Sequence, residues 1–411
     1  MGNIMRLYIK AKQTLKLAFF IFLRAASYII PKKQSLVLFG ARNGDYYMDN
    51  SRDLFEWMLE HQRDVEVVWM TRSRAVYQQL SERSIPVEKL DSLRGILLLF
   101  RSRVAIYSNT LLDFSLHWAL VPKSVKALCL GHGAPIKNYR FTIKSGIKGE
   151  FLKNLKRASK VTNFAIASSA FIAKLDSKCQ QIDFLKYHIT GYPRNDRILK
   201  PTTSMKNWWG NFIGESQYQS ILLYAPTWRK EGEEQTKFFP FEDFDIDSLL
   251  EYLKVHKILL LMRPHIKDLE NNQSFMKFKQ LMDKEDSHIK LATSNEVVDV
   301  NDILPFIDVL ITDYSSIMTD FLLLDNPIMF FPYDFKEFDA VNGFVYDYYK
   351  YLPGPAIQSF EGFKQHLDQL MLGVDDYASK RHEMTQLSYE FVDSNACERV
   401  SNLIVKSLKD Q

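Results

Sequence analysis

The chain has 411 residues, of which 46% are hydrophobic and 25% charged, the composition of an ordinary soluble globular protein. This length exceeds what one hydrophobic core supports, so we expect two domains. The three cysteines lack metal-ligand spacing and cannot all form disulfides, which argues against a disulfide-stabilised protein and predicts a reducing, cytosolic compartment. The net charge of +4 is unevenly distributed, because no acidic residue precedes Asp45.

Residues 1–33 combine helical periodicity with positive charge on one side. On a helix, apolar side chains such as Leu15, Phe19 and Phe22 fall opposite an arc of basic residues. That arc contains Arg6, Lys10, Lys12, Lys16 and Arg24. The apolar run is far shorter than the ~20 residues that span a bilayer. We therefore expect a basic amphipathic helix on an anionic membrane surface; a signal peptide or a helix packed on the protein's own core are the alternatives.

From residue 34 onward, short apolar runs alternate with helical patterns. The predicted strands of the first half are SLVLFG from Ser35, VEVVWM from Val65, VAIYSN from Val104, VKALCL from Val125 and FAIASS from Phe164. Continuous apolar runs separated by helices, such as the one expected at 51–62, are typical of buried parallel strands. The pattern predicts a doubly wound α/β domain over residues 34–200.

A second α/β pattern follows a polar, interrupted stretch at 201–218, which we interpret as a linker. Its predicted strands are SILLYAPTWR from Ser220, KILLLMRPH from Lys257, HIKLAT from His288, DVLITDYSS from Asp308 and PIMFFPYD from Pro327. The second domain therefore covers residues 219–390, and a C-terminal helix covers 391–411. Because doubly wound sheets bind ligands at the carboxyl ends of their strands, we expect a central cleft between two facing domains.

Chemically distinctive side chains collect at the predicted strand ends. They are His132 in the first half and Arg229, Arg263, His265, Asp313, Ser315 and Ser316 in the second. Guanidinium groups, together with hydroxyl groups at a helix start, suit the oxygens of a diphosphate. Each residue also has a plain structural explanation: a structural histidine for His265, a helix cap for Ser315, a surface charge for Arg229. Their convergence on one crevice favours a binding site.

Other familiar catalytic motifs are missing from the sequence. No GxGxxG follows the first strand, and neither GxxxxGK[ST] nor GxSxG occurs. The acidic segment from Asp243 to Asp247 is better explained as a solvated turn than as a metal site. We expect no metal, no cofactor and no nucleic-acid partner.

Five segments carry a resemblance to a known family. They are GHGAPIK from Gly131, GYPRND from Gly191, YAPTWR from Tyr224, RPH from Arg263 and ITDYSSIMTDFLLLDNPIMFFPYD from Ile311. In this order they resemble the CDP-glycerol glycerophosphotransferase family, which builds teichoic acids and related wall or capsule polymers, and the resemblance covers most of residues 35–390. It implies a GT-B-like fold of two Rossmann-like domains, acceptor first and nucleotide donor second, at the cytoplasmic face of the membrane.

The resemblance also implies roles for individual residues. His132 and His265 are the expected catalytic residues. His132 matches the histidine proposed as general base, and His265 forms with Arg263 an Arg-x-His motif expected at the donor pyrophosphate. The other positions assigned to donor binding are Gly133, Ala134, Pro135, Arg194, Pro226, Thr227, Arg229, Pro264, Ser315, Ser316 and Asp320. Gly131 stands where many members have tryptophan, and Ala134 where threonine is frequent, so the identity of the acceptor stays open.

These roles describe a phosphoryl transfer. A hydroxyl of a lipid-linked glycan or polyol-phosphate acceptor attacks the β-phosphorus of CDP-glycerol and loses its proton to His132, and CMP leaves. Flanking glycines would permit close approach of the substrate. The alternatives are CDP-ribitol as donor, a glycosyltransferase that uses a nucleotide sugar, or a non-catalytic membrane-associated binding protein. The sequence DYSSIMTD suits phosphate better than sugar.

A basic segment, residues 136–160, follows the predicted base. It carries Lys137, Arg140, Lys144, Lys148, Lys153, Lys156, Arg157 and Lys160 against Glu150 alone. A solvated helix face and a second basic surface for anionic lipid or acceptor phosphates both fit this pattern.

Overall fold

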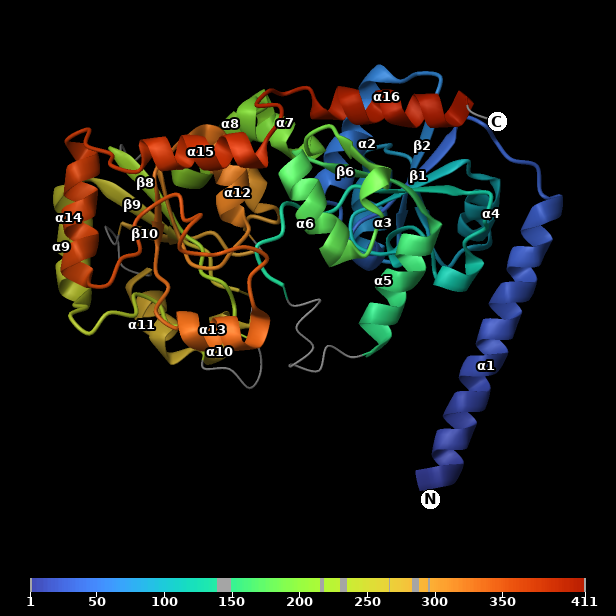
Figure 1. The fold of residues 1–411 in the computed structure, drawn as a ribbon, viewed down its shortest axis with the longest axis horizontal. Coiled ribbons are helices and arrows are strands. Elements are labelled where there is room, and N and C mark those ends of the chain that lie inside the picture. The colour runs from blue at the N-terminus through green and yellow to red at the C-terminus, as the bar shows by residue number, and fades with distance from the viewer. Residues whose placement is uncertain are drawn as a thin grey trace. The chain divides into compact units, whose positions relative to one another are not determined.

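A computed structural model describes residues 2–138, 149–214, 218–229, 235–265, 267–282, 288–294 and 296–409. The chain divides into two compact units, each built on a parallel sheet (Figure 1). Unit 1 consists of Met1–His132, Gly146–Arg194 and Asn395–Gln411. Unit 2 consists of Gly133–Ser145 and Asn195–Ser394.

Unit 1 contains a seven-stranded sheet in the order β3-β2-β1-β4-β5-β6-β7. Its strands are β1 (Leu36–Phe39), β2 (Glu66–Thr71), β3 (Val87–Lys89), β4 (Val104–Tyr107), β5 (Lys126–Cys129), β6 (Thr162–Ala167) and β7 (Tyr187–Ile189). All neighbouring strands are parallel; Leu38, for example, lies opposite Val68 on one side and Ala105 on the other. The central strands β1 and β4 are buried along their whole length, as the continuous apolar runs predict.

In the described part of the chain, seven helices belong to unit 1, and three of them begin at serine caps. They are α1 (Gly2–Ala26), α2 (Asp49–His61), α3 (Arg74–Glu82), α4 (Leu93–Arg101), α5 (Gly149–Val161), α6 (Ala170–Gln180) and α16 (Ala396–Lys409). The side chains of Ser73, Ser92 and Ser169 accept backbone N–H groups at the starts of α3, α4 and α6. Such caps satisfy N–H groups that have no partner within the helix. Helix α7 (Pro193–Leu199) begins in unit 1 and ends in unit 2.

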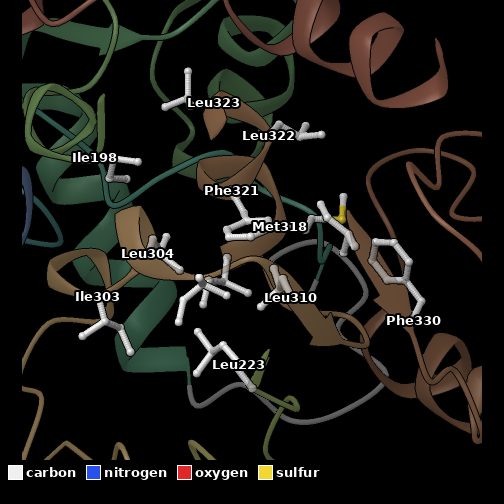
Figure 2. Close-up of a cluster of buried hydrophobic side chains, with 14 of the residues drawn as sticks. Ile198, Leu223, Ile303, Leu304, Leu310, Met318, Phe321, Leu322, Leu323 and Phe330 are labelled. Carbon is white, nitrogen blue, oxygen red and sulfur yellow. The ribbon is translucent and has the colours of Figure 1, made fainter. Parts of the chain in front are cut away.

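Unit 2 contains a five-stranded parallel sheet in the order β10-β9-β8-β11-β12. The strands are β8 (Ser220–Tyr224), β9 (Ile258–Met262), β10 (Ile289–Leu291), β11 (Val309–Thr312) and β12 (Ile328–Phe330). One face of the sheet packs on a cluster that includes Leu223, Leu310, Met318, Phe321 and Phe330 (Figure 2). Every strand expected from an apolar run is therefore present in the two sheets.

The helices of unit 2 complete its layers. They are α8 (Thr203–Ile213), α9 (Ile246–Val255), α10 (Asp268–Asn271), α11 (Gln273–Met282), α12 (Ile317–Phe321), α13 (Phe335–Asn342), α14 (Phe360–Met371) and α15 (Ala378–Ser388). A second cluster, with Leu222, Leu260 and Phe275 among its members, packs on the other face of the sheet. Helices on both faces explain why its strands are apolar throughout.

Two predicted boundaries differ from the structure. The stretch interpreted as a linker contains α8, whose Trp209 is buried and stacks on Phe306 at 4.9 Å within the core of unit 2. Its polar residues misled the prediction because only one face of α8 is buried. The C-terminal helix, α16, packs with unit 1: Lys126 Nζ donates to the carbonyl of Ser407 at 2.8 Å. The end of the chain therefore returns to the first unit.

Helix α1 contacts unit 1 through its C-terminal part. Phe20 is buried and stacks on the His117 ring at 4.7 Å, beside a short 3-10 turn at Trp118–Leu120. Leu15 (72% exposed), Phe19 (56%) and Phe22 (70%) do not share this burial. Within the part of the chain that the structure describes, no helix is long and apolar enough to cross a membrane.

Candidate active site

His132 lies in the loop that follows β5, between two glycines in left-handed conformations. Gly131 has φ 60° and Gly133 has φ 110°, values that favour glycine. His132 is partly exposed, with its Nδ1 buried. The backbone before it is held by Asn50 Nδ2, which donates to the carbonyls of Leu130 at 3.2 Å and Gly131 at 3.1 Å. The loop that carries the imidazole is thus fixed by a side chain from α2.

Arg194, expected at the donor, makes its described contacts within unit 1. Its Nη1 donates to the His132 carbonyl at 2.8 Å and to Asp49 Oδ1 at 3.1 Å. The residue is 6% exposed. These contacts place Arg194 in the scaffold of the His132 loop, and its predicted donor contact stays a prediction.

The chain passes from unit 1 to unit 2 directly after His132. Ala134 is buried, and Ile136 packs in the core of unit 2. Lys137 then pairs in antiparallel fashion with Phe344, and the Val345 N–H donates to the Ile136 carbonyl at 3.0 Å. The segment that follows the imidazole is therefore anchored in unit 2.

In unit 2 the loops after β8 and β11 meet through Asp313. Because these strands are neighbours, their carboxyl ends lie at the same edge of the sheet. Asp313 Oδ1 accepts the Thr227 N–H at 2.8 Å and the Tyr314 N–H at 2.5 Å. Pro226 and Thr227 remain partly exposed at this edge. Asp313 thus fixes the backbone of the segment predicted to contact the nucleotide.

Arg229, expected to face phosphate, is buried between two carboxylates. Its Nε and Nη2 donate to the two oxygens of Asp334 at 2.7 and 2.8 Å, and Nη1 donates to Asp313 Oδ2 at 2.9 Å. Burial alone would lower the pKa of this guanidinium, but Asp313 and Asp334 raise it overall. The rings of Tyr314 and Phe338 lie 5.1 and 5.0 Å away. Arg229 therefore ties together the loops after β8, β11 and β12, and its predicted donor contact stays a prediction.

Arg263 holds a neighbouring loop. Its Nη1 donates to the carbonyls of Ala292 at 2.7 Å and Val297 at 2.9 Å. Burial lowers its pKa, which Asp299 and Asp302 partly counteract. Pro264 beside it is buried. At least one guanidinium nitrogen of Arg263 is therefore committed to the backbone after β10.

His265 is exposed at the end of β9 and stacks on Trp228, with ring centroids 5.0 Å apart. Its Nδ1 lies 3.3 Å from the Lys267 N–H, which makes Nδ1 an acceptor and puts the proton of the neutral ring on Nε2. Partial desolvation of the ring lowers the pKa of His265 below its ordinary 6.5; Asp268 opposes this shift and Lys267 adds to it. With Nδ1 as an acceptor, the neutral ring presents Nε2–H as a donor.

Ser315 and Ser316 are partly exposed before α12, which spans only five residues. The Ile317 N–H reaches Ser315 Oγ at a long 3.4 Å, and the Ser316 side chain makes no capping hydrogen bond. So short a helix contributes little dipole, because the dipole grows with aligned peptides. Asp320 is buried and accepts from Asn195 Nδ2 at 2.9 Å. The serine hydroxyls therefore remain candidates for donor contact, and Asp320 has an internal partner.

The acidic segment predicted as a solvated turn caps two helices. The oxygens of Asp243 accept the Phe360 and Glu361 N–H groups at 2.8 and 3.0 Å, and Asp245 caps α9 through the Ser248 N–H. These backbone hydrogen bonds lower the pKa of Asp243. Among the residues that the structure describes, no group of three or more His, Cys, Asp or Glu could hold a metal ion.

The basic segment at 136–160 is only partly described. Arg140, Lys144 and Lys148 lie outside the described residues. Lys137 lies 5.8 Å from the Phe338 ring in unit 2, and Arg157 lies 4.2 Å from the Trp118 ring in unit 1. The possible roles of this segment in lipid or acceptor binding both stay predictions.

Sequence comparison identifies the family. The profile described as "CDP-Glycerol:Poly(glycerophosphate) glycerophosphotransferase" matches residues 22–406. The chain belongs to this family. This glycerophosphotransferase-family chain is 25% identical to the teichoic acid glycerol-phosphate transferase of Staphylococcus aureus, over 92% of the chain and 94% of that protein. It is 28% identical to the teichoic acid poly(ribitol-phosphate) polymerase of Bacillus spizizenii, over 62% of the chain and 38% of that protein.

The fold of this family member resembles that of a solved relative. The wall teichoic acid polymerase TagF matches with a TM-score of 0.75 at 20% identity, over 100% of this chain and 99% of that chain. At this identity the likeness establishes a shared α/β fold with parallel sheets and carries no functional detail. The chain is, by family, a teichoic acid polyol-phosphate transferase.

Several residues that build the site have no distinctive sequence signal. Asp49 and Asn50 follow a tyrosine-rich loop, and Asp334 follows the last strand; each could be a solvated turn residue. The sequence places Asp313 at a strand end but does not indicate that its carboxylate binds Thr227 and Arg229. Their partners lie far away along the chain, so only the folded structure identifies them.

Proposed function

We propose that the protein transfers glycerol phosphate from CDP-glycerol to a hydroxyl of a membrane-linked acceptor and releases CMP. The acceptor oxygen forms a bond to the β-phosphorus, the bond from that phosphorus to the bridging oxygen breaks, and CMP leaves with the electron pair. The observation that carries this proposal is the family match, which extends over residues 22–406 and so includes both the His132 loop and the strand ends of unit 2.

In this proposal His132 accepts the proton of the attacking hydroxyl. An imidazole titrates near neutral pH, which suits a general base that must be neutral before the reaction and cationic after it. Support comes from its partial exposure and from the glycines on either side. The proposal therefore assigns the base to unit 1 and donor binding to unit 2.

Donor binding is assigned to unit 2. We assign the pyrophosphate to the Nε2–H of His265 and the hydroxyls of Ser315 and Ser316, because these residues are exposed or partly exposed at the carboxyl edge of the sheet, whereas the Thr227 hydroxyl is buried. Arg263, partly exposed, adds positive charge nearby. Fixed donors of this kind suit phosphoryl transfer, which depends mainly on positioning and electrostatics.

Glycerol rather than ribitol is proposed as the transferred polyol. The match to the glycerol-phosphate transferase of Staphylococcus aureus covers 92% of this chain, whereas the match to the ribitol-phosphate polymerase covers 62%. The ribitol relative keeps CDP-ribitol as a second candidate donor, because its sequence identity over that shorter range is slightly higher, 28% against 25%.

A donor panel tests the reaction. Purified full-length protein is incubated with CDP-glycerol, CDP-ribitol or a UDP-sugar, with a bacterial membrane extract as acceptor. We expect release of CMP and incorporation of glycerol phosphate with CDP-glycerol only. Incorporation of ribitol phosphate would change the donor, and release of UDP would replace the proposal with a glycosyltransferase.

We also propose that α1 attaches the protein to the cytoplasmic face of the membrane. Leu15, Phe19 and Phe22 are spaced i, i+4 and i+7, so they share one helix face, and all three are exposed. Lys12 and Lys16 are exposed nearby. Apolar side chains flanked by lysines suit an anionic headgroup layer.

Point variants test this attachment better than deletion of the helix, because Phe20 is part of the core. We expect the combined variant Leu15→Ser, Phe19→Ser and Phe22→Ser to lose sedimentation with phosphatidylglycerol vesicles while the unchanged protein sediments. Leu185→Ser is the matched control, since Leu185 is 86% exposed elsewhere in unit 1. Equal sedimentation of the triple variant and the unchanged protein would contradict the proposal.

A further inference from the structure

The loop that carries His132 is held at three successive carbonyl groups. Asn50 Nδ2 donates to the first two, those of Leu130 at 3.2 Å and Gly131 at 3.1 Å. Arg194 Nη1 donates to the third, that of His132 itself, at 2.8 Å. Backbone carbonyls in an irregular loop commonly face water, so three anchored in sequence leave the peptide planes of this loop little freedom.

The same two side chains are joined to each other. Asn50 Oδ1 accepts the backbone N–H of Arg194 at 3.2 Å, so the Asn50 amide uses both its oxygen and its nitrogen. Asp49 Oδ1 accepts from Arg194 Nη1 at 3.1 Å, and Asp49 is 1% and Asn50 0% exposed. A buried charge pair of this kind fixes the Arg194 guanidinium beside the loop.

Asp49 adopts a backbone conformation that is unfavourable for most residues. Its φ is +68°, in the left-handed region, at the first residue of α2. Only glycine adopts this region freely, and Asp and Asn tolerate it better than other side chains. Strained backbone persists where surrounding contacts enforce it and is frequent near functional sites. Here the strained turn brings a carboxylate and then an amide to the loop after β5.

We propose that Asp49 and Asn50 are positioning residues that set the orientation of His132 through the backbone of Leu130–Gly131–His132. The inference rests on the proposed role of His132 as general base. Both residues next to His132 are glycines with positive φ, so its own backbone provides little restraint. With the three carbonyls anchored, the imidazole direction depends only on its side-chain torsions.

The hydrogen-bond network of Asp49, Asn50 and Arg194 with the His132 loop also lies where the chain leaves unit 1. The polypeptide passes into unit 2 directly after His132 and again directly after Arg194. The hydrogen bond from Arg194 to the His132 carbonyl therefore joins two places where the chain leaves unit 1. Asp49 and Asn50, at the start of α2, bind both places. The position of the imidazole relative to the rest of unit 1 is thus set by one helix end.

Two variants test the proposal against a matched control. Asn50→Ala removes the amide, and Asp49→Asn removes the charge while it keeps the shape and the tolerance for positive φ. Ser51→Ala is the control, because Ser51 is fully buried in the same turn of α2 but bonds to Ser108 Oγ at 2.8 Å instead of the His132 loop. All are made in the full-length protein and compared by kcat, donor KM and CDP affinity from calorimetry.

We expect kcat of Asn50→Ala to fall by roughly 10²-fold, the cost of a displacement of about 1 Å in a reacting group. Donor KM and CDP affinity should stay within about twofold, because unit 2 supplies the proposed donor contacts; a purely structural defect would not spare them. Asp49→Asn should lower kcat by a smaller factor in the same direction. A folded Asn50→Ala protein with unchanged kcat, or an equal loss in Ser51→Ala, would overturn the proposal.

Amide hydrogen exchange gives a readout that does not depend on turnover. We expect faster exchange in peptides covering 128–134 for Asn50→Ala and Asp49→Asn, and no change there for Ser51→Ala. If no polyol donor yields CMP with the unchanged protein, the proposed function fails but this readout still tests whether the network orders the loop. If Asn50→Ala does not fold, Asp49→Asn decides, and unchanged exchange in it overturns the proposal.

Discussion

Arg229 is a buried charged residue near a strand end that holds the loops of the candidate site together. Its guanidinium uses the planar fork of arginine to bind Asp334 with two nitrogens and Asp313 with a third. The sequence YAPTWR places this residue at a strand end but does not identify its partners, because a fork suits a carboxylate as well as a phosphate. The carboxylate of Asp334 lies 105 residues away along the chain, so only the folded structure identifies it as a partner.

Arg229→Met should therefore destabilise unit 2. The variant leaves two carboxylates without their buried cation, and breaking such a pair costs about 3–5 kcal/mol. The loss of stability is measured as a lower unfolding temperature, with hydrogen exchange of β8 and β11 monitored as the temperature rises. Arg94→Met is the control, since Arg94 pairs with Glu88 while its side chain is 81% exposed. Equal stability of the Arg229 variant and the unchanged protein would contradict the internal role.

At the scale of elements, continuous apolar runs predicted the long buried strands, whereas short partly exposed segments were missed. β3 (sequence VEK) and β7 (sequence YHI) have three residues each and lie at the edges of the first sheet. Their sequences lack an apolar run because edge strands are covered less completely. The helix α8 was missed for a related reason: its buried side carries few residues, with Trp209 foremost.

Two glycines in these elements should respond to alanine with opposite signs. At Gly40, after β1, a Cβ would lie 1.8 Å from the Asp113 carbonyl oxygen, so Gly40→Ala must displace backbone and should cost roughly 2–4 kcal/mol. At Gly210, inside α8, a Cβ would meet nothing within 4 Å. There alanine favours the helix by about 0.5–1 kcal/mol. Chemical denaturation measures both; a Gly40→Ala protein as stable as Gly210→Ala would contradict the packing described after β1.

At the scale of the whole molecule, the alternation of strands and helices predicted two α/β sheets joined in one chain. The same alternation does not predict that α16 belongs to unit 1. The sequence of α16 indicates that one of its faces is buried, but not which unit covers that face. Val400 and Ile404 form part of that face. The division of the chain is therefore discontinuous, with unit 1 drawing on both ends of the polypeptide.

Ile404→Ala should weaken unit 1 selectively. Ile404 is 1% exposed, and truncation of a buried isoleucine costs about 2–5 kcal/mol. We expect faster hydrogen exchange in β1 and β4 but not in β8 and β9. Asn402→Ala on the exposed side of α16 is the control. Equal acceleration in both sheets, or none in either, would contradict the assignment of α16 to unit 1.

The proton transfer to His132 is tested most directly by the pH dependence of CMP release in the unchanged protein and in His132→Gln. We expect kcat/KM of the unchanged protein to rise with pH through the range in which an imidazole loses its proton. His132→Gln should be roughly 10²–10⁴-fold slower, without that ionisation and with unchanged CDP affinity. Near-normal turnover by a folded His132→Gln protein, or the same ionisation in its profile, would contradict a general-base role for His132.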